Sequence, residues 1–238
     1  MLLHDAPRFR IFFGGKNDSV SSPVVDTDHF LDSQPLRKVG TLLHADQFFF
    51  AHQTHSADGY VVMQDIFPDH ALFKKDGDFL VSNSPGMAIG VLTADCLPIV
   101  LYDPVFNVVS VVHAGWRGSA AGVAVSALEK MGSAFGTQPG NVQVFFGPAA
   151  GICCYQVGAD FVKNFENYPY AHYMLQRHGM GYFFDLAGFN RQLLITAGIK
   201  KDAFHEQYNI CTICDLGFCS YRREAQESKR QLTVVALK

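Results

Sequence analysis

The feature that most constrains the fold is a pair of apolar segments with almost nothing between them. MAIGVLT (87–93) and LPIVLYD (97–103) are separated only by Ala94, Asp95 and Cys96. Apolar runs of this length are typical of buried strands, so the pair forms either two strands or one bent strand. Further short strands are predicted for QFFFAH, GYVVMQ, NVVSVV, VQVFFGP and QLTVVAL.

Helices are predicted between some of these strands. Three segments carry helical patterns: SAAGVAVSALEKMG, ADFVKNFE and FDLAGFNRQLLITAGI, the last with Asp185 as N-cap and Gly198 as its stop. Strands that alternate with helices indicate an α/β protein, whereas strand neighbours without a helix between them indicate mixed sheets. We therefore predict an α/β fold in which residues 1–238 form a single layered domain, with mixed β-sheets covered by helices.

Composition excludes several classes of protein. The net charge of -3 and the pI near 6.3 leave no basic surface for a phosphate backbone, so no nucleic-acid partner is expected. No apolar run is long enough to span a bilayer, and the N-terminal segment lacks the pattern of a secretory signal. We expect a cytoplasmic protein without a membrane partner, in which the six cysteines are reduced.

Three potential metal ligands fall at ends of predicted strands. His55 lies in the turn QTHSAD, Cys96 lies between the two apolar runs, and His113 lies where a strand becomes the turn HAGWRG. Side chains at strand ends converge on one cleft in many α/β proteins. Two imidazoles and one thiolate suit zinc and leave a fourth position open, as a catalytic site requires. The alternative for each histidine is a structural role in the core.

Five segments, in this order, resemble the laccase-domain or multicopper polyphenol oxidase family, also described as zinc-dependent purine nucleoside phosphorylases with adenosine deaminase activity. They are QTHSADGYVV, LTADCLPIVLYD, VVHAGWRG, FGPAAGICCYQVG and CTICDLGFCSYRRE. The resemblance implies that His55, Cys96 and His113 are the metal ligands and catalytic residues. It also implies purine nucleosides and phosphate as substrates, with zinc as cofactor and copper as the alternative.

Two reactions are expected at such a site. Phosphate attacks the ribose C1′ while the base departs, or water activated by zinc attacks the purine C6 and displaces ammonia. The alternatives are a copper-dependent phenol oxidase, a thiol hydrolase using Cys96 or Cys154, and a non-catalytic interaction domain. The phenol oxidase is disfavoured because three ligands do not assemble several copper centres.

Arginines and aspartates supply the other candidate site residues. Arg117 precedes a predicted helix and is a candidate for holding phosphate, with an ion pair at the edge of the core as the alternative. Arg37 and Arg222 are further candidates for phosphate or ribose contacts. Asp78 and Asp95 are candidates for orienting a metal ligand or acting as a base, although Asp78 equally suits the cap of a turn.

The remaining thiols have open roles. Cys211 and Cys214 form a C-x-x-C pair, for which a redox or structural zinc role is one alternative. Cys153 and Cys154 follow a Gly-Pro loop, and one of them is a candidate nucleophile with His113 as its base. The stretch from Gly14 to Leu36 is the most loop-like part of the chain and is predicted to be a mobile flap. This stretch departs from the pattern of the family that the chain resembles, and the departure bears on substrate preference.

Overall fold

The computed structural model describes residues 1–21, 30, 32–63, 75–179 and 181–238. The two apolar runs form two separate strands, β7 (Met87–Thr93) and β8 (Leu97–Asp103), and every residue of both is buried. They belong to different sheets. Asp95, between them, has a φ of 82°, a left-handed conformation that Asp adopts more readily than most residues. The chain therefore crosses from one sheet to the other within three residues.

The first sheet has the strand order β1-β2-β15-β7-β4, with β3 also paired to β15. Its central strand is the C-terminal β15 (Arg230–Leu237), which runs antiparallel to both of its long neighbours, β2 and β7. Only the pairing of β4 with β7 is parallel, so the sheet is mixed. The remaining strands are β1 (Leu2–Asp5), β2 (Phe9–Phe13), β3 (Ser19–Val20) and β4 (Gln47–Phe49).

The second sheet has the order β14-β10-β8-β9-β6-β5. Its centre is the antiparallel pair of β8 and β9 (Val108–Ala114), which places Pro98 opposite His113. Both outer pairings, β10 with β14 and β5 with β6, are parallel. The outer strands are β5 (Gly59–Val61), β6 (Phe79–Ser82), β10 (Gln143–Phe146) and β14 (Phe204–His205).

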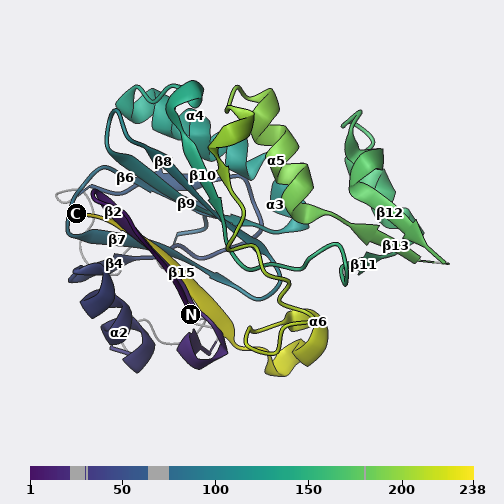
Figure 1. Ribbon diagram of the computed structural model, residues 1–238, viewed down its shortest axis with the longest axis horizontal. Helices are drawn as coiled ribbons and strands as arrows, with labels where there is room; N and C mark the ends of the chain where they lie inside the picture. Colours follow the sequence, from purple (N-terminus) through teal and green to yellow (C-terminus); the bar gives the residue numbers. More distant parts are fainter. Residues whose placement is uncertain (22–29, 31, 64–74, 180) are drawn as a thin grey trace.

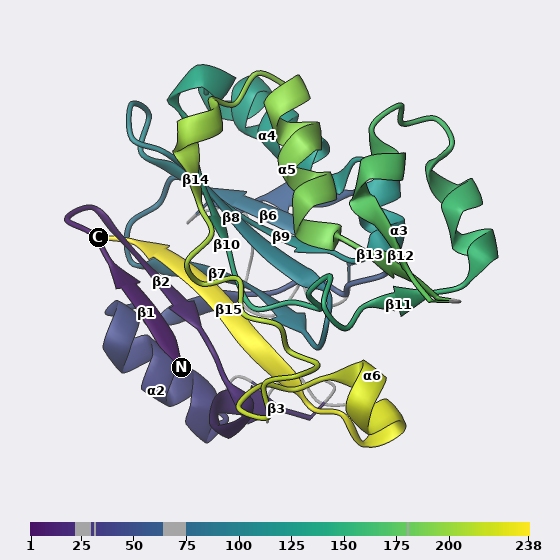
Figure 2. The same ribbon diagram turned by 45° about the vertical axis from the view of Figure 1, so that its right-hand side comes forward.

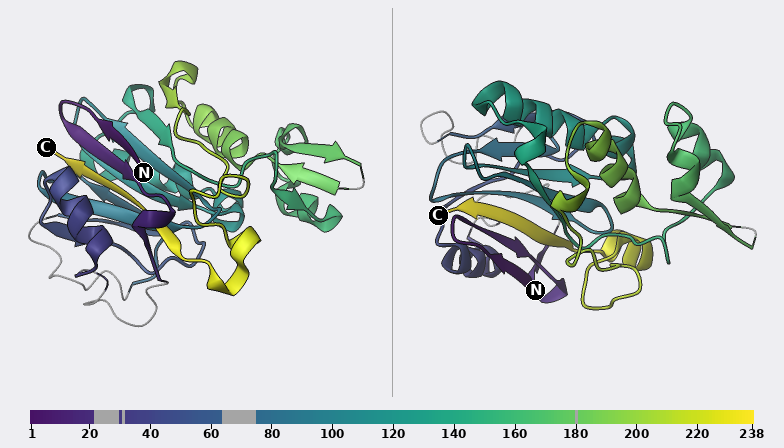
Figure 3. Two further views of the ribbon diagram at one scale, coloured as in Figure 1. Left: turned by 60° about the horizontal axis from the view of Figure 1, so that its bottom comes forward. Right: turned by 45° about the horizontal axis from the view of Figure 1, so that its top comes forward.

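Four layers result from the packing of these sheets; Figure 1 shows them stacked, and Figure 3 shows them from two tilted directions. Alternate residues of β8 point to opposite faces: Leu97 and Ile99 belong to the cluster beneath the helices, and Val100 and Tyr102 belong to the cluster between the two sheets. The first sheet is covered on its outer face by α2 (Gln34–Leu43). Because both faces of each sheet are covered, the central strands are largely apolar and nearly all of their residues are buried.

Helices α4 (Val123–Phe135) and α5 (Leu186–Thr196) cover the outer face of the second sheet. The single helix predicted over SAAGVAVSALEKMG is divided in two, because Gly122 takes a φ of 82° and separates α4 from α3 (Trp116–Ala120). The cap and stop predicted for α5 are confirmed. Asp185 accepts a hydrogen bond from the Gly188 N–H at 2.8 Å, and Gly198 has a φ of 102°.

The segment ADFVKNFE forms a 3-10 helix, η4 (Ala159–Phe165), instead of the predicted α-helix. It contacts the 3-10 helix η5 (Ala171–Met174) and leads into a small antiparallel sheet of order β11-β13-β12, which extends beyond the helical layer in Figure 2. Its strands are β11 (Gln156–Val157), β12 (Leu175–His178) and β13 (Gly181–Phe184).

The prediction of an α/β fold with mixed sheets covered by helices is confirmed. None of the described helices is long and apolar enough to cross a membrane. The predicted flap lies partly outside the described residues. Its described parts include the 3-10 helix η1 (Lys16–Asp18), β3 and the start of α2. The last helix, α6 (Tyr221–Glu224), and the 3-10 helices η3 (Pro139–Asn141), η6 (Lys201–Ala203) and η7 (Ala225–Glu227) are short.

Candidate functional site

The second sheet and the loop after β4 bring three predicted ligands together. Cys96 immediately precedes β8 and His113 is the penultimate residue of β9, so the β8–β9 pairing sets these two side by side. His55 comes from the loop between β4 and β5, where it takes a φ of 64°. The site therefore draws one ligand from a turn between two sheets and two from one strand pair.

The donor atoms of His55, Cys96 and His113 all lie within 4.8 Å of one another. The Cys96 Sγ is 3.7 Å from the His55 Nε2, and the two imidazole rings meet edge to face with centroids 4.7 Å apart. His113 is buried, whereas His55 and Cys96 are partly exposed. Small adjustments of side chains that are already this close can surround one ion while leaving a side open.

The Asp78 carboxylate organises this cluster from behind. It is fully buried and accepts hydrogen bonds from three successive backbone N–H groups, those of Thr54, His55 and Ser56, at 3.2, 3.0 and 2.6 Å. It also lies 2.7 Å from the Nδ1 of His113. One carboxylate thus holds the loop that carries His55 and directs the other nitrogen of His113, its Nε2, away from itself and toward the cluster. The turn cap predicted for Asp78 is present, and Asp78 also contacts His113, whose role as a metal ligand stays a prediction.

Gly115 leaves the space that the His55 and Cys96 side chains fill. A Cβ atom at this position would lie 2.7 Å from the His55 Cδ2 and 3.0 Å from the Cys96 Sγ. Carbon atoms do not approach so closely, so any larger residue would displace a donor side chain. The HAGWRG motif therefore supplies His113 together with the room beside it.

The ionisable groups of the cluster shift one another's pKa values. Burial raises the pKa of the Cys96 thiol, but the adjacent imidazoles of His113 and His55 outweigh it and lower the pKa to about 6. Burial lowers the pKa of His113, and the Cys96 and Asp78 charges reverse this and raise it to about 9. For Asp78, hydrogen bonds and the charge of His113 overcome burial and lower the pKa to about 2. The site thus favours the thiolate, the form of cysteine that binds metal or acts as a nucleophile.

Asp95, the other candidate aspartate, fixes the backbone before Cys96. Its carboxylate accepts hydrogen bonds from the Thr212 hydroxyl at 2.6 Å, the Ser220 hydroxyl at 3.0 Å and the Arg222 N–H at 2.7 Å. The C-terminal segment therefore supports the left-handed turn that presents the Cys96 thiol. Asp95 acts on the chain rather than on an imidazole.

Arg117 lies in the first turn of α3, two residues beyond Gly115. Its side chain is exposed, and its guanidinium carbon lies 4.5 Å from the centre of the Trp116 ring. Trp116 packs in turn against Phe161 of η4, with ring centroids 5.2 Å apart. An exposed guanidinium held on an aromatic ring keeps its donors available for an anion.

Arg222 lies on α6, where its Nη1 donates to the backbone carbonyl of Gln156 at 2.9 Å. Its guanidinium carbon is 5.0 Å from the centre of the Tyr155 ring. Tyr155 is buried, and burial followed by the nearby Cys96 charge raises the pKa of its hydroxyl to about 12. Tyr155 therefore carries a neutral phenol whose pKa is affected by the Cys96 charge.

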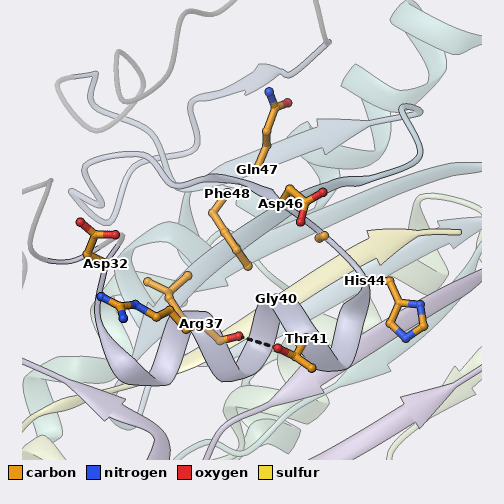
Figure 4. Close-up of a pocket in the computed structure, with 10 residues that line it drawn as sticks. Asp32, Arg37, Gly40, Thr41, His44, Asp46, Gln47 and Phe48 are labelled. Carbon is orange, nitrogen blue, oxygen red and sulfur yellow. Dashed lines mark hydrogen bonds between the residues drawn. The ribbon is translucent and has the colours of Figure 1, made fainter.

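Arg37 lies elsewhere in the molecule. It is on α2 and lines a hollow of about 580 Å³ together with Asp32, His44 and Asp46, as Figure 4 shows. Figures 1 and 2 place α2 at the opposite side of the first sheet from α3. The structure therefore separates Arg37 from His55, Cys96 and His113, whereas Arg117 follows His113 closely in the chain.

Sequence reasoning did not single out Tyr155 or the combined action of Asp78. Tyr155 directly follows the Cys153–Cys154 pair, which drew attention to the thiols instead. For Asp78, the signal was its position immediately before the apolar run FLVS of β6, since a polar residue at the end of a strand can face the cleft.

Comparison with known proteins gives consistent results. Residues 32–238 match the family described as multi-copper polyphenol oxidoreductase laccase. A purine nucleoside phosphorylase of Deinococcus radiodurans is 35% identical over 164 residues, which cover 68% of this chain and 62% of that protein. The adenosine deaminase RL5, from an unknown prokaryotic organism, is 33% identical over 201 residues, 79% of this chain and 74% of that one.

Solved structures show the same architecture over the full length. The hypothetical protein YfiH of Bacillus licheniformis superposes with a TM-score of 0.85 at 27% identity and covers 99% of both chains. YlmD of Geobacillus stearothermophilus has a TM-score of 0.82 at 25% identity, covering 97% of this chain and 91% of that one. The layered fold is therefore shared by other proteins.

Proposed function

Because the chain belongs to the multi-copper polyphenol oxidoreductase laccase family, whose relatives include proteins named for enzyme activities, we propose that it is a zinc-dependent purine nucleoside phosphorylase. Adenosine deamination is proposed as a second reaction of the same site. The observation that carries this proposal is the convergence of the His55, Cys96 and His113 donor atoms within 4.8 Å. Two nitrogens and a thiolate are a suitable donor set for zinc, and three ligands leave the fourth position to substrate.

Different residues of the chain are proposed to bind the zinc ion, to orient its ligands and to leave space beside them. His55, Cys96 and His113 would hold the zinc ion, and Asp78 would keep the His113 imidazole oriented through its Nδ1. When bound, zinc supplies Lewis-acid chemistry, polarising an oxygen atom and lowering the pKa of water. Gly115 keeps the space beside the ligands clear.

For phosphorolysis, Arg117 is proposed to hold the phosphate. Its exposed guanidinium, fixed over Trp116, offers paired donors to phosphate oxygens. A phosphate oxygen then forms a bond to the ribose C1′ while the bond from C1′ to the purine nitrogen breaks. Arg222, held over Tyr155, is proposed for contacts to the ribose or phosphate. Trp116, which is partly exposed, is proposed to provide aromatic surface for a purine.

For deamination, the purine C6 is proposed to lie beside Cys96 and His113, with Tyr155 as a neutral phenol nearby. Water adds at C6 and ammonia leaves, so the reaction consumes no phosphate. Phosphate dependence therefore separates the two activities. The cytoplasm, where nucleosides and phosphate are both present, is the proposed compartment.

A thiol hydrolase is the second candidate. Cys96, His113 and Asp78 have the chemistry of its nucleophile, its base and the carboxylate that orients the base. In that case Cys96 attacks as a thiolate and zinc would block it. A Cys154 nucleophile is less favoured, because the Cys154 thiol is clustered with three other thiols. The copper oxidase suggested by the family's description needs more copper ligands than this cluster offers.

The test is a nucleoside panel with and without phosphate, run beside metal analysis of protein prepared without added metal. We expect phosphate-dependent release of base from adenosine or inosine, lost on chelation and restored by zinc, and unchanged when oxygen is removed. Activity that rises on chelation would identify the thiol hydrolase instead. A strict requirement for copper and oxygen would identify the phenol oxidase.

A further inference from the structure

A second cluster of potential metal ligands lies outside the site described above. The Sγ atoms of Cys153, Cys154, Cys211 and Cys214 all lie within 4.8 Å of one another. We propose that these four thiols bind a single structural zinc ion that joins the segment after β10 to the segment before α6. This site does not depend on the proposed enzyme activity.

The spacing of the sulfur atoms fits one tetrahedral ion. Zinc binds thiolates at about 2.3 Å, and a tetrahedron with bonds of that length has sulfur-to-sulfur edges of about 3.8 Å. The Sγ atoms of Cys153 and Cys214 are 3.8 Å apart. An iron–sulfur cluster places several iron and sulfide atoms among its thiolates and so needs them farther apart.

Local backbone structure brings four thiols to one point. Cys153 and Cys154 lie in a tight turn in which the Cys154 N–H donates to the Gly151 carbonyl at 2.9 Å. Cys211 and Cys214 lie in a second turn, closed by the Asp215 N–H donating to the Cys211 carbonyl at 3.1 Å. The two segments meet in a parallel bridge between Ala149 and Cys211. A C-x-x-C turn facing another cysteine pair is the usual arrangement of a structural zinc site.

Gly151 forms one wall of this cluster. Its N–H donates to the Cys211 sulfur at 3.3 Å, as backbone amides do toward metal-bound thiolates. A Cβ at Gly151 would lie 3.0 Å from the Cys211 Cβ and 3.3 Å from the Cys153 and Cys211 sulfurs. Glycine therefore allows the backbone to approach the thiols closely.

A positive charge lies beside the C-x-x-C turn. Nη1 of Arg223 donates to the carbonyls of Thr212 and Ile213, the two residues between Cys211 and Cys214, at 2.7 and 2.9 Å. Four thiolates around Zn²⁺ leave a net charge of about −2. The guanidinium offsets part of that charge and orders the turn.

The location explains what such an ion would stabilise. Thr212, next to Cys211, donates to the Asp95 carboxylate, and the Ala150 N–H donates to the Asp95 carbonyl at 2.8 Å. Both joined segments therefore support the left-handed residue before Cys96. A disulfide between Cys153 and Cys214 would join the same segments, but it would use only two of the four thiols.

The experiment measures zinc per chain in the full-length protein, prepared without added metal. In the Cys96→Ala background, which removes a ligand of the other cluster, we expect one zinc to remain. Adding Cys153→Ser and Cys214→Ser should reduce it to near zero. Cys219→Ser is the matched control, because Cys219 is a buried cysteine outside both clusters, and it should leave the zinc in place.

A second measurement on the chain with all six cysteines guards against variants that do not fold. With zinc bound at both clusters, five thiols, the four of this cluster and Cys96, should resist a thiol reagent and become reactive when a chelator is added, and protection of a single thiol would overturn the proposal. Cobalt(II) in place of zinc, in the Cys96→Ala background, should give the intense visible absorption of a tetrahedral all-thiolate site. Iron in place of zinc, two thiols missing under denaturing conditions, or no chelator-dependent protection would overturn the proposal. Loss of zinc only with Cys96→Ala would overturn it while leaving the proposed function standing.

Discussion

The two clusters of potential metal ligands differ in the number of donors, in the kind of donor and in the groups that surround them. The His55, Cys96 and His113 cluster has three donors of two kinds, one of them buried, and a carboxylate behind it that orients both an imidazole and a loop. The thiol cluster has four donors of one kind, two of them exposed, and backbone amides around it. Three mixed ligands leave a position for a substrate, whereas four thiolates fill the coordination shell.

The two clusters also differ in what holds their donor atoms in place, and this difference accompanies the difference in donor types. The Asp78 carboxylate is fully buried and contacts the His55 loop and His113, so the backbone that carries His55 and the His113 ring are held in place without an ion. The thiol cluster sits in two surface turns, whose arrangement an ion would itself complete. A site that performs chemistry needs the first kind of support, and a site that joins segments needs only the second.

The largest expected effect is the difference in nucleoside turnover between two variants, each of which loses one potential ligand of one cluster. His113→Ala should remove zinc from the first cluster and lower nucleoside turnover by roughly 10²- to 10⁴-fold, the range of a catalytic group. Cys154→Ala should lower the melting temperature and leave turnover within a few-fold. Steady-state kinetics and metal analysis of both variants check this. The opposite ranking would assign the chemistry to the thiol cluster.

The next largest effect is expected for Arg117, because only a cluster that leaves a coordination position to substrate would need an arginine for phosphate. Arg117→Ala should weaken phosphate use by roughly 1.5 to 3 kcal/mol, the loss of a charge-assisted hydrogen bond, without changing the zinc content. The effect should appear in the KM for phosphate. Arg37→Ala, on α2, is the matched control and should change that KM by less than about twofold. Equal effects would place the phosphate site elsewhere.

Removing the negative charge of Asp78, which lies behind the cluster of His55, Cys96 and His113, should have a smaller effect. Asp78→Asn leaves the ligands intact, yet zinc affinity at that cluster should fall roughly 10- to 100-fold, as for other carboxylates that orient a ligand. Zinc bound by the four thiols should be unaffected. Asp103→Asn is the matched control, since Asp103 is also a buried carboxylate that accepts backbone N–H groups, those of Val105 and Phe106. Competition with a chelating dye measures both affinities.

The smallest expected effect tests the space beside the ligands. Gly115→Ala should weaken zinc binding by about 1 kcal/mol, because the new methyl group collides with the ends of the His55 and Cys96 side chains, which can shift slightly. Gly158→Ala is the control: both glycines precede a short helix with nearly the same backbone angles, but a Cβ at Gly158 meets nothing within 4 Å. If both variants bind zinc equally well, the glycine is not needed for the site.

Much of this could be predicted from the sequence where the signal is local. The apolar runs 87–93 and 97–103 became strands with those bounds, because a segment buried on both faces has no polar residue to interrupt it. The three convergent donors were predictable because all stand at ends of strand patterns. The break at Gly122 was not, since a glycine inside an alanine-rich segment is compatible with either a continuous or a divided helix.

Other features depended on contacts between distant parts of the chain. Cys153 and Cys214 are 61 positions apart, and the two cysteine pairs gave no sequence signal that they meet. Arg37 and Arg117 looked alike in the sequence, and only the packing of α2 on the first sheet separates them. Side-chain chemistry can be read residue by residue, but proximity across sheets cannot.

The crossing of the chain at Asp95 also bears on the order of events in refolding. His55 lies in the loop from β4 of the first sheet to β5 of the second, and Cys96 precedes β8 where the chain passes between the same two sheets, so the donors meet through contacts between segments far apart in the sequence. Contacts of such long sequence separation form late and slowly in most proteins. Uptake of an ion by this cluster would therefore follow the formation of these long-range contacts, whereas secondary structure would form before it.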